Sequence, residues 1–599
     1  MQDLRVGFGG SEVVRGISFS VAPGECVAIV GESGSGKSVT ARALLGLAGA
    51  GSDVRATAFT VAGRDALGFG PRDWRRLRGG FAGLVLQDAL VSLDPLRTVG
   101  AEIGEVLAFH DVVPRAGRTA KVLELLESVG VPEPELRAGQ HPHELSGGLR
   151  QRVLIASAIA AGPELIIADE PTTALDVTVQ AQILRLLAGR KAAGTALLLI
   201  SHDLAVVGSI ADRILVMRDG QIVEQGPARD VLTTPAHDYT CALLAAVPSA
   251  ASRGTRLSDR TGASDQARLS DGAGVSGRTQ PVEGSHSADG VRPSDGARPE
   301  ETARPAESLR RAEGVRRAEG AQLTEGAGPT QAAAPAATAP VPVPVLAVTN
   351  LTRSYGSRRV VDDVSFALYR GETLGIVGES GSGKTTLARL ALGLLDPDRG
   401  QVTLHDQPWS GLPERLRRPL RQRIQLVSQN PLDSFDPRHT AGRLVAEPLR
   451  SRSRWRWRWR LPREERRAAV LELLARVGLP PEVAARHPRE LSGGQRQRIA
   501  IARALGPRPD VLVCDEPVSA LDVSIQAQVL DLLAELQHEY GTAMVFISHD
   551  LGVVHHLADR VLVMKDGRVV EEGNVDEVFS RPRHPYTRDL VAAVPRLPD

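Results

Sequence analysis

A glycine-rich pattern that ends in lysine and a hydroxyl residue occurs twice, as VGESGSGKS at 30–38 and VGESGSGKT at 377–385. In such a loop the glycines let backbone N–H groups wrap phosphate oxygens at the start of a helix, and the lysine reaches the outer phosphates. One loop could arise by chance or bind another phosphate ligand, but two copies favour a nucleoside triphosphate. The candidate phosphate-binding residues are Gly31, Gly34, Gly36, Lys37 and Ser38 in the first copy and Gly378, Gly381, Gly383, Lys384 and Thr385 in the second.

Each half also has an Asp-Glu pair directly after an apolar run, LIIADE at 165–170 and VLVCDE at 511–516. The aspartate can hold Mg²⁺ from one side while the hydroxyl that ends the glycine-rich loop holds it from the other. A nearby glutamine can join the metal shell. The predicted metal ligands are Ser38, Gln87 and Asp169 in the first half and Thr385, Gln429 and Asp515 in the second.

Three further side chains in each half suit hydrolysis. The glutamate after the metal-binding aspartate can orient and deprotonate water, the glutamine can contact that water, and a histidine can donate to the γ-phosphate. A lone histidine after a strand is more often structural, but the triplet SHD occurs twice, which favours the functional interpretation. The candidate catalytic residues are Gln87, Glu170 and His202, and Gln429, Glu516 and His549.

These motifs each follow a short apolar run, such as CVAIV, LIIAD and ALLLIS in the first half and LGIV, VLVCD and MVFIS in the second. Such runs are typical of strands buried on both faces of a parallel sheet. Ligands of parallel α/β sheets bind beyond the carboxyl ends of the strands. We therefore expect all of these motifs to meet at one edge of a sheet.

The two halves are an internal duplication, because FGGSEVVRGISFSVAPGECVAIVGESGSGKS aligns without a gap to YGSRRVVDDVSFALYRGETLGIVGESGSGKT. We predict a first domain at 1–250, a linker at 251–345 and a second domain at 346–599. Residues 251–345 are rich in Gly, Ser, Ala, Pro and Arg and contain no aromatic residue. This composition is typical of a disordered tether; the alternative is an ordered recognition module.

Composition excludes several classes of protein. The chain has 72 basic and 71 acidic residues among 599, so no global charge points to nucleic acid, and we expect no such partner. Its three cysteines are scattered, which argues against disulfides, zinc ribbons and iron–sulfur clusters. No uninterrupted apolar run is long enough to span a membrane, and no secretory signal is evident. We expect a multidomain protein that stays in the cytoplasm.

The order of the motifs, glycine-rich loop, Gln, LSGG, DE, ALD and His, resembles the ATP-binding cassette (ABC) ATPases over both halves. This resemblance implies ATP and Mg²⁺ as cofactors. It also implies an α/β fold with two P-loop, RecA-like nucleotide-binding domains, each with a β-rich edge and a helical subdomain, joined by the disordered linker. In that family the LSGG helix of one cassette closes over the nucleotide of the other, so we expect intramolecular head-to-tail pairing.

The resemblance assigns further residues. An aromatic ring 29 positions before the lysine would stack on adenine, and Asp176 and Asp522 would lie where the cassettes meet. The one departure is Leu149, where the second copy has Gln495; we expect a weaker polar contact there without loss of hydrolysis. The remaining assignments are Phe8 and Tyr355 for adenine, Ser146, Gly147 and Gly148 for the site at Lys384, and Ser492, Gly493, Gly494 and Gln495 for the site at Lys37.

Both halves end alike, with HDYT at 237–240 and HPYT at 584–587. The second resembles the C-terminal signature of ATPases that serve oligopeptide, dipeptide and nickel importers; an ordinary turn and helix is the alternative. The resemblance implies import of peptides or similar small solutes, including nickel or glutathione. It also implies two transmembrane permease subunits, indirectly an extracytoplasmic solute-binding protein, and a peripheral position on the cytoplasmic face of the membrane.

Other functions compete with import. An ATPase of a drug or antibiotic exporter would use the same chemistry, and a tandem-cassette translation factor would act on ribosomes. The tail signature and the Pro-Gly-Ser tether argue against the translation factor, and the short spacing from Lys37 to Ser146 argues against a DNA-repair ATPase. The run RSRSRWRWRWR from Arg450 to Arg460 has no counterpart in the first half. It is either a solvated insertion or a membrane contact.

Overall fold

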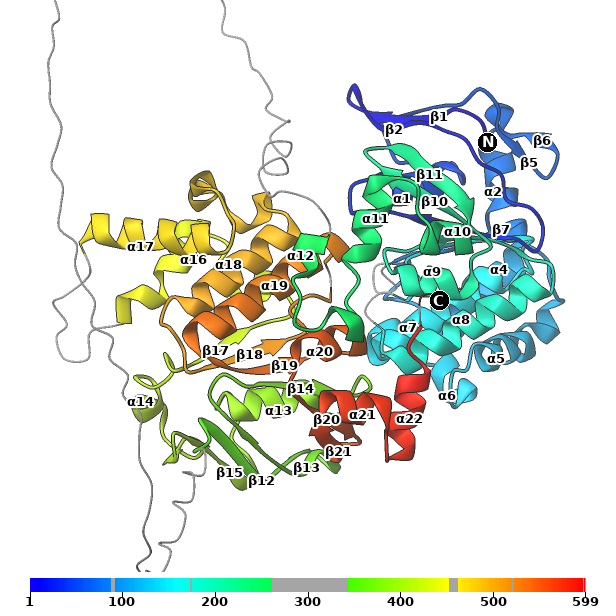
Figure 1. Ribbon diagram of the computed structural model, residues 1–599. Coiled ribbons are helices and arrows are strands. Elements are labelled where there is room, and N and C mark those ends of the chain that lie inside the picture. Colours follow the sequence, from blue (N-terminus) through cyan, green and yellow to red (C-terminus); the bar gives the residue numbers. More distant parts are fainter. Residues whose placement is uncertain are drawn as a thin grey trace, which may run out of the picture. The chain divides into compact units, whose positions relative to one another are not determined.

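The computed structural model describes residues 1–87, 92–172, 175–260, 343–451, 462–519, 521–595 and 597 (Figure 1). Both predicted ATPase domains belong to one compact unit. Most of the predicted linker lies outside the described residues. So do the tryptophans of the Arg450–Arg460 run, and its membrane contact therefore stays a prediction.

The first cassette is built on a six-stranded sheet in the order β11-β10-β3-β9-β8-β7. Strands β7 to β10 pair in parallel with their neighbours and with β3, whereas β11 runs antiparallel on the edge. Strands β3 and β9 are buried along their whole length, as expected for apolar runs covered on both faces. The strands are β3 (Cys26–Val30), β7 (Ala82–Val85), β8 (Leu165–Asp169), β9 (Ala196–Ile200), β10 (Arg213–Arg218) and β11 (Gln221–Pro227).

Several helices of the first cassette follow strands of the main sheet. Helix α8 illustrates the local cause: Asp176 caps it by accepting from Val179 N at 2.9 Å, and its apolar face buries Ile183 and Leu187. Helices between these strands are α1 (Lys37–Ala43), α7 (Gly147–Ile159), α8 (Val177–Ala192) and α9 (Leu204–Ile210), and α10 (Ala228–Thr233) and α11 (Asp238–Ala245) follow the last strand.

Two smaller parts complete the first cassette. A three-stranded antiparallel edge sheet, β2-β1-β4, precedes a β5–β6 hairpin, and a group of helices lies between β7 and α7. The strands are β1 (Leu4–Phe8), β2 (Ser11–Ile17), β4 (Ser52–Arg55), β5 (Thr60–Val61) and β6 (Arg64–Asp65). The helices are η1 (Ala66–Gly68), α2 (Pro71–Gly80), α4 (Val99–Phe109), η2 (Arg115–Gly117), α5 (Arg118–Ser128), α6 (Pro134–Ala138) and η3 (Pro142–Glu144).

The second cassette repeats this topology, with a main sheet in the order β17-β18-β19-β14-β20-β21 and an edge sheet β13-β12-β15-β16. The main strands are β14 (Thr373–Val377), β17 (Ile424–Val427), β18 (Val511–Asp515), β19 (Ala543–Ile547), β20 (Arg560–Lys565) and β21 (Arg568–Asn574). The edge strands are β12 (Leu346–Tyr355), β13 (Arg358–Leu368), β15 (Arg399–Leu404) and β16 (Gln407–Pro408).

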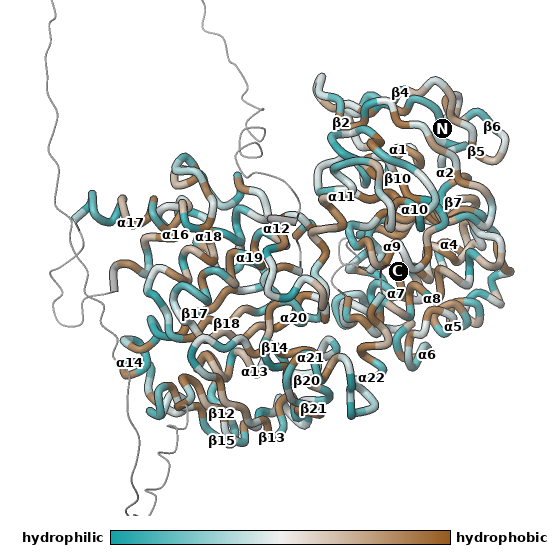
Figure 2. Tube along the Cα trace, viewed as in Figure 1, coloured by the Kyte–Doolittle hydropathy of each residue, from teal (hydrophilic) through white to brown (hydrophobic). Residues whose placement is uncertain are grey.

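Helices of the second cassette follow the same order. Apolar segments gather in the interior and polar ones on the outside, as the hydropathy colouring shows (Figure 2). The helices are α13 (Lys384–Ala391), α14 (Glu414–Arg417), α15 (Pro431–Ser434), α16 (Ala441–Ala446), η5 (Pro448–Ser451), α17 (Arg463–Arg476), η6 (Pro481–Ala485), η7 (Pro488–Glu490), α18 (Gly493–Leu505), α19 (Val523–Tyr540), α20 (Leu551–Leu557), α21 (Val575–Ser580) and α22 (Pro585–Ala592).

The predicted fold class is confirmed: each half is an α/β cassette with a largely parallel central sheet, an antiparallel edge sheet and a helical subdomain. The described structure continues ten residues past the predicted end of the first domain, through η4 (Ala250–Ser252) and α12 (Leu257–Arg260). The domain division itself stays a prediction. Within the described residues, no helix combines the length and apolarity needed to cross a membrane.

Candidate nucleotide-binding and hydrolysis sites

The two glycine-rich loops join β3 to α1 and β14 to α13, beyond the carboxyl ends of the strands. Gly31 has φ +147°, and an added Cβ would lie 2.1 Å from the Met217 carbonyl oxygen of β10. Gly378 repeats this, with 2.2 Å to the Met564 carbonyl oxygen of β20. Only glycine therefore lets each loop cross the neighbouring strand so closely.

Each loop holds its lysine side chain against its own backbone. Lys37 Nζ donates to the carbonyl oxygens of Gly31 at 2.7 Å and Glu32 at 2.8 Å, and Lys384 Nζ makes the same bonds to Gly378 and Glu379. Burial lowers the pKa of both lysines, and neighbouring carboxylates oppose that effect. Each buried ammonium thus faces the space that its loop encloses.

The predicted hydroxyl and aspartate pairs are brought together. Ser38 Oγ donates to Asp169 Oδ1 at 2.9 Å, and Thr385 Oγ1 lies 3.4 Å from Asp515 Oδ1. Burial raises the pKa of both aspartates, and the hydroxyl bond opposes it. Asp169 Oδ2 is buried and has no hydrogen-bond partner among the described residues.

Each candidate catalytic glutamate contacts the candidate glutamine and histidine of its own half. Gln87 Nε2 donates to Glu170 Oε2 at 2.9 Å, and His202 Nδ1 lies 3.2 Å from Glu170 Oε1. In the second cassette Gln429 Nε2 donates to Glu516 Oε2 at 2.9 Å and His549 Nδ1 lies 3.3 Å from the same oxygen. The sequence motifs therefore converge as expected at the carboxyl edge of each sheet.

The histidine and the glutamate shift each other's pKa. Burial alone would raise the pKa of Glu516, but the hydrogen bond and charge of His549 outweigh it, so this pKa lies below its usual range. Burial alone would lower the pKa of His549, but Glu516 raises it. Glu170 raises the pKa of His202 in the same way. A histidine beside the glutamate thus favours the ionised carboxylate that a general base requires.

The LSGG serines cap the helices that follow them. Ser146 Oγ accepts from Leu149 N at 3.4 Å and Ser492 Oγ accepts from Gln495 N at 3.3 Å. Gln495 Oε1 also accepts from Ser492 N at 3.2 Å, a bond that Leu149 cannot make. These bonds lie within one cassette, so contact with the opposite nucleotide stays a prediction for the whole LSGG set.

The two aromatic candidates differ in exposure. Tyr355 ends β12 with 48% of its surface exposed, and the Arg353 guanidinium lies 5.4 Å from its ring centre. Phe8 ends β1 half-buried against the core of the first cassette. Stacking of adenine on either ring stays a prediction.

Each glycine-rich loop is also contacted by an aspartate of the other cassette. Ser33 donates to Asp522 Oδ1 through its N–H at 2.7 Å and its hydroxyl at 2.6 Å. Ser380 N donates to Asp176 Oδ2 at 3.4 Å. Asp176 and Asp522 occupy the N-cap positions of α8 and α19, the helices that follow the Asp-Glu pairs, and only Asp176 also caps its helix through its side chain. Both therefore lie where the cassettes meet, as predicted.

Sequence reasoning missed one residue in each site. Tyr239 of HDYT accepts from Glu32 N at 3.1 Å, and Tyr586 of HPYT accepts from Glu379 N at 3.0 Å. The histidine before each tyrosine caps the tail helix, with Tyr239 N donating to His237 Nδ1 at 3.1 Å. The repetition of HxYT after both cassettes was the available signal. The tail tyrosine thus accepts a hydrogen bond from the backbone of the glycine-rich loop.

Comparison with known families agrees with this geometry. The ABC transporter family matches residues 14–173 and 361–519. The chain belongs to the ABC transporter ATPases. A second family, the oligopeptide/dipeptide transporter C-terminal region, matches residues 223–274 and 570–599. These ranges contain both HxYT motifs, so the resemblance drawn from the tails is confirmed.

Relatives match this ABC ATPase over nearly its full length. The oligopeptide transport ATP-binding protein OppD of Mycobacterium tuberculosis is 43% identical over 97% of this chain and 95% of its own. The glutathione import ATP-binding protein GsiA of Escherichia coli K12 is 40% identical over 97% of this chain and 86% of its own. The peptidoglycan transport ATP-binding protein YejF of Agrobacterium fabrum is 40% identical over 99% of this chain and 95% of its own.

Solved cassettes match one part of the chain. The dimeric structure of a bacterial ABC transporter cassette has 31% identity and a TM-score of 0.36, covering 38% of this chain and 98% of that one. Membership of the family makes the chain an ATP-binding and ATP-hydrolysing subunit of a peptide-type transporter with membrane permease partners. The predicted enzyme class is therefore confirmed.

Proposed function

We propose that this ABC ATPase binds to the cytoplasmic face of the membrane and powers the uptake of peptides or similar small solutes. The repeated Gln–Glu–His cluster, present at the carboxyl edge of both sheets, carries the ATPase part of the proposal. The two tails that match the oligopeptide/dipeptide transporter region support the transport part. Names of relatives point to oligopeptides, glutathione and peptidoglycan fragments as solute classes.

In this proposal Glu170 and Glu516 are the general bases. Each takes a proton from the attacking water, and Gln87 or Gln429 orients that water. His202 and His549 donate to the γ-phosphate, and His549 lowers the pKa of the neighbouring Glu516 carboxyl. Partial burial of each glutamate and histidine side chain strengthens the contact between them. Phosphate oxygens are bound by the loop amides and by Lys37 or Lys384.

The donor set also fits Mg²⁺. A buried carboxylate oxygen of Asp169 without a hydrogen-bond partner lies beside the Ser38 hydroxyl, and such hard oxygen ligands suit this ion. Thr385 and Asp515 form the corresponding pair, and Gln87 and Gln429 would complete the two shells. When bound, the ion would neutralise charge that develops on the phosphates.

Two composite sites follow from head-to-tail pairing of the cassettes. Ser492, Gly493, Gly494 and Gln495 would close over the nucleotide at Lys37, and Ser146, Gly147 and Gly148 over the nucleotide at Lys384. The bonds from Ser33 to Asp522 and from Ser380 to Asp176 support this pairing. Phe8 and Tyr355 would stack on the adenines. Residues 251–345 would connect the two cassettes, at 1–250 and 346–599.

Partners of this ATPase would be two transmembrane permease subunits, with an extracytoplasmic solute-binding protein that selects the solute. The test is purification of tagged full-length protein from gently solubilised cells, together with uptake of labelled di- and oligopeptides. We expect co-purified multispanning permeases, and uptake that the double variant Glu170→Gln/Glu516→Gln abolishes while leaving complex assembly intact. Co-purified ribosomal proteins without permeases would overturn the transport proposal and favour a translation factor. Labelled-solute efflux would favour an exporter.

A further inference from the structure

The tail of the first cassette continues onto the second cassette. We use the word strap for residues 247–258, which follow α11. Ser252 is fully buried, and its Oγ lies 2.9 Å from Nδ1 of the buried His556. Leu257 is also fully buried, within an apolar cluster made almost entirely of second-cassette residues. The strap is therefore packed into the second cassette rather than resting on its surface.

Polar contacts fix the strap at several points. Asp531 accepts from Leu257 N at 2.9 Å and from Ser258 N at 2.7 Å. Arg253 pairs with Asp576 at 2.6 Å, and Arg256 pairs with Glu535 at 2.8 Å. The two ion pairs are partly exposed and add little stability individually. Burial of Ser252 and Leu257, and the double acceptor Asp531, account for most of the attachment.

The first cassette lacks this docking surface, which consists of Asp531, Glu535, His556 and Asp576. Alignment of DVTVQAQILRLLAGR with DVSIQAQVLDLLAEL places Arg185 at Asp531 and Gly189 at Glu535. Alignment of the SHD helices and of the segments that follow places Ser209 at His556 and Arg229 at Asp576. Arg229 would thus repel Arg253, Gly189 offers no partner for Arg256, and Arg185 cannot accept from the strap backbone as Asp531 does. The strap is complementary to only one of the two cassettes.

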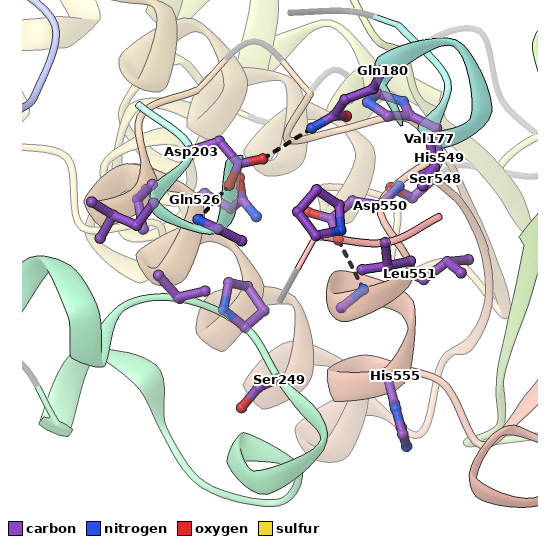
Figure 3. A pocket seen from close by; sticks show the side chains of 18 of the residues that line it. Val177, Gln180, Asp203, Ser249, Gln526, Ser548, His549, Asp550, Leu551 and His555 are labelled. Carbon is purple, nitrogen blue, oxygen red and sulfur yellow. Dashed lines mark hydrogen bonds between the residues drawn. The ribbon is translucent and has the colours of Figure 1, made fainter. Parts of the chain in front are cut away.

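The strap contacts α20, which begins just after His549. Its Pro248 carbonyl approaches Gly552 so closely that an added Cβ would lie 2.8 Å away, and Ser252 bonds His556 on the last turn. Strap residue Ser249 lines a cavity of about 520 Å³ together with His549, Asp550 and His555 (Figure 3). Both ends of α20 are therefore held by the first cassette's tail.

The other end of the same tail holds the glycine-rich loop at Lys37. Tyr239 of α11 accepts from Glu32 N, and the strap begins two residues after α11 ends. One short continuous segment thus links the nucleotide loop of the first cassette to the helix behind His549. The opposite tail ends differently, with Leu597 packed on the apolar core of the first cassette.

We propose that the strap couples the loop at Lys37 to the site at Lys384 by positioning α20, and with it His549 against Glu516. Ser252, Leu257 and His556 are then positioning residues for that site. This inference rests on the proposed roles of Glu516 and His549. If the strap undocked, α20 would lose these contacts. ATP hydrolysis at Glu516 would then slow, while the affinity for ATP at Lys384 would stay unchanged.

The test measures kcat and KM for ATP of full-length protein in two backgrounds, Glu170→Gln, where only Glu516 acts, and Glu516→Gln, where only Glu170 acts. Leu257→Asp places a charge in the buried apolar cluster where the Leu257 side chain packs. We expect it to lower kcat by about tenfold in the first background and to change KM by less than about twofold, a coupling of ordinary size. In the Glu516→Gln background kcat should stay unchanged.

A milder variant tests the specificity of the docking surface. Arg253→Glu/Arg256→Glu should lower the same kcat, and adding Glu535→Arg/Asp576→Arg should restore it. The control Arg185→Glu/Arg229→Glu also replaces two arginines by glutamates, but at the first-cassette positions that align with Asp531 and Asp576, and it should have no effect. Equal losses in both backgrounds, a loss confined to KM, or no rescue by the charge swap would overturn the coupling.

Failure of the proposed catalytic roles would look different. If Glu516→Gln and Glu170→Gln left ATPase activity unchanged with an intact strap, the general-base assignment would fail before any strap variant was made. If Glu170→Gln or Glu516→Gln alone abolished activity, the strap variants would be measured in the chain that keeps both glutamates. There the coupling still requires that the charge swap restore kcat at constant KM.

Discussion

The two nucleotide sites share every catalytic motif but differ in how the opposite cassette contacts them. At Lys37, Asp522 Oδ1 accepts two bonds from Ser33, at 2.7 and 2.6 Å, whereas at Lys384 Asp176 accepts one bond from Ser380 at 3.4 Å. Ser524 Oγ also donates to Glu32 at the first site. The loop at Lys37 is thus the more tightly held. A duplicated motif keeps its local chemistry while its long-range contacts diverge.

The largest effect should come from the general bases. Replacing both Glu170 and Glu516 by glutamine removes the proton acceptor at each site, so ATPase activity should fall by roughly 10²- to 10⁴-fold. Steady-state phosphate release measures it. Because the Gln–Glu–His geometry is nearly the same at both sites, the two single variants should retain similar activities; a wide difference would show that the sites are functionally unequal.

The contacts from the opposite cassette should give a smaller and unequal effect. Asp522→Ala removes the acceptor of two short bonds from the opposite loop. Asp176→Ala removes the acceptor of one long bond from the opposite loop and, within its own cassette, the cap of α8. A hydrogen bond to a charged group contributes about 1.5–3 kcal/mol. We therefore expect Asp522→Ala to raise KM for ATP about tenfold and Asp176→Ala by less than about threefold. Equal effects in ATP titrations would remove the asymmetry between the sites.

The tail tyrosines should act alike at both sites. Tyr239→Phe and Tyr586→Phe each delete one neutral hydrogen bond to the loop backbone, a contribution of about 1 kcal/mol, or roughly fivefold in nucleotide affinity. Binding of a fluorescent ATP analogue measures this change. The bond lengths of 3.1 and 3.0 Å predict equal losses. An effect at one tyrosine alone would make the tail contact specific to that cassette.

The smallest effect concerns the one departure within the LSGG motifs. Leu149→Gln would let a side chain accept from Ser146 N, as Gln495 does from Ser492 N, and one such capping bond adds about 0.3–1.5 kcal/mol. Calorimetry should show a small rise in the free energy of unfolding, with ATPase activity little changed. Gln495→Leu is the reciprocal control and should lower stability by a similar amount.

Much of each site was predictable because the decisive residues follow buried strands. The runs before Lys37, Asp169 and His202 are strands β3, β8 and β9, and parallel pairing brings their carboxyl ends to one edge. The Gln–Glu–His cluster therefore formed as expected. Periodicity and motif order suffice for such contacts, because the regular sheet determines where each strand ends.

Sequence by itself determined the duplication, the fold class, the phosphate loops and the family of the chain. Tertiary structure alone decided that Tyr239 holds the loop at Glu32, that Asp522 contacts Ser33, and that Ser252, within the predicted linker, lies buried beside His556. The residues in these pairs are separated by 207, 489 and 304 positions, so no local sequence pattern predicts the contacts. Such contacts arise only when folded cassettes bring distant surfaces with complementary charge and shape together.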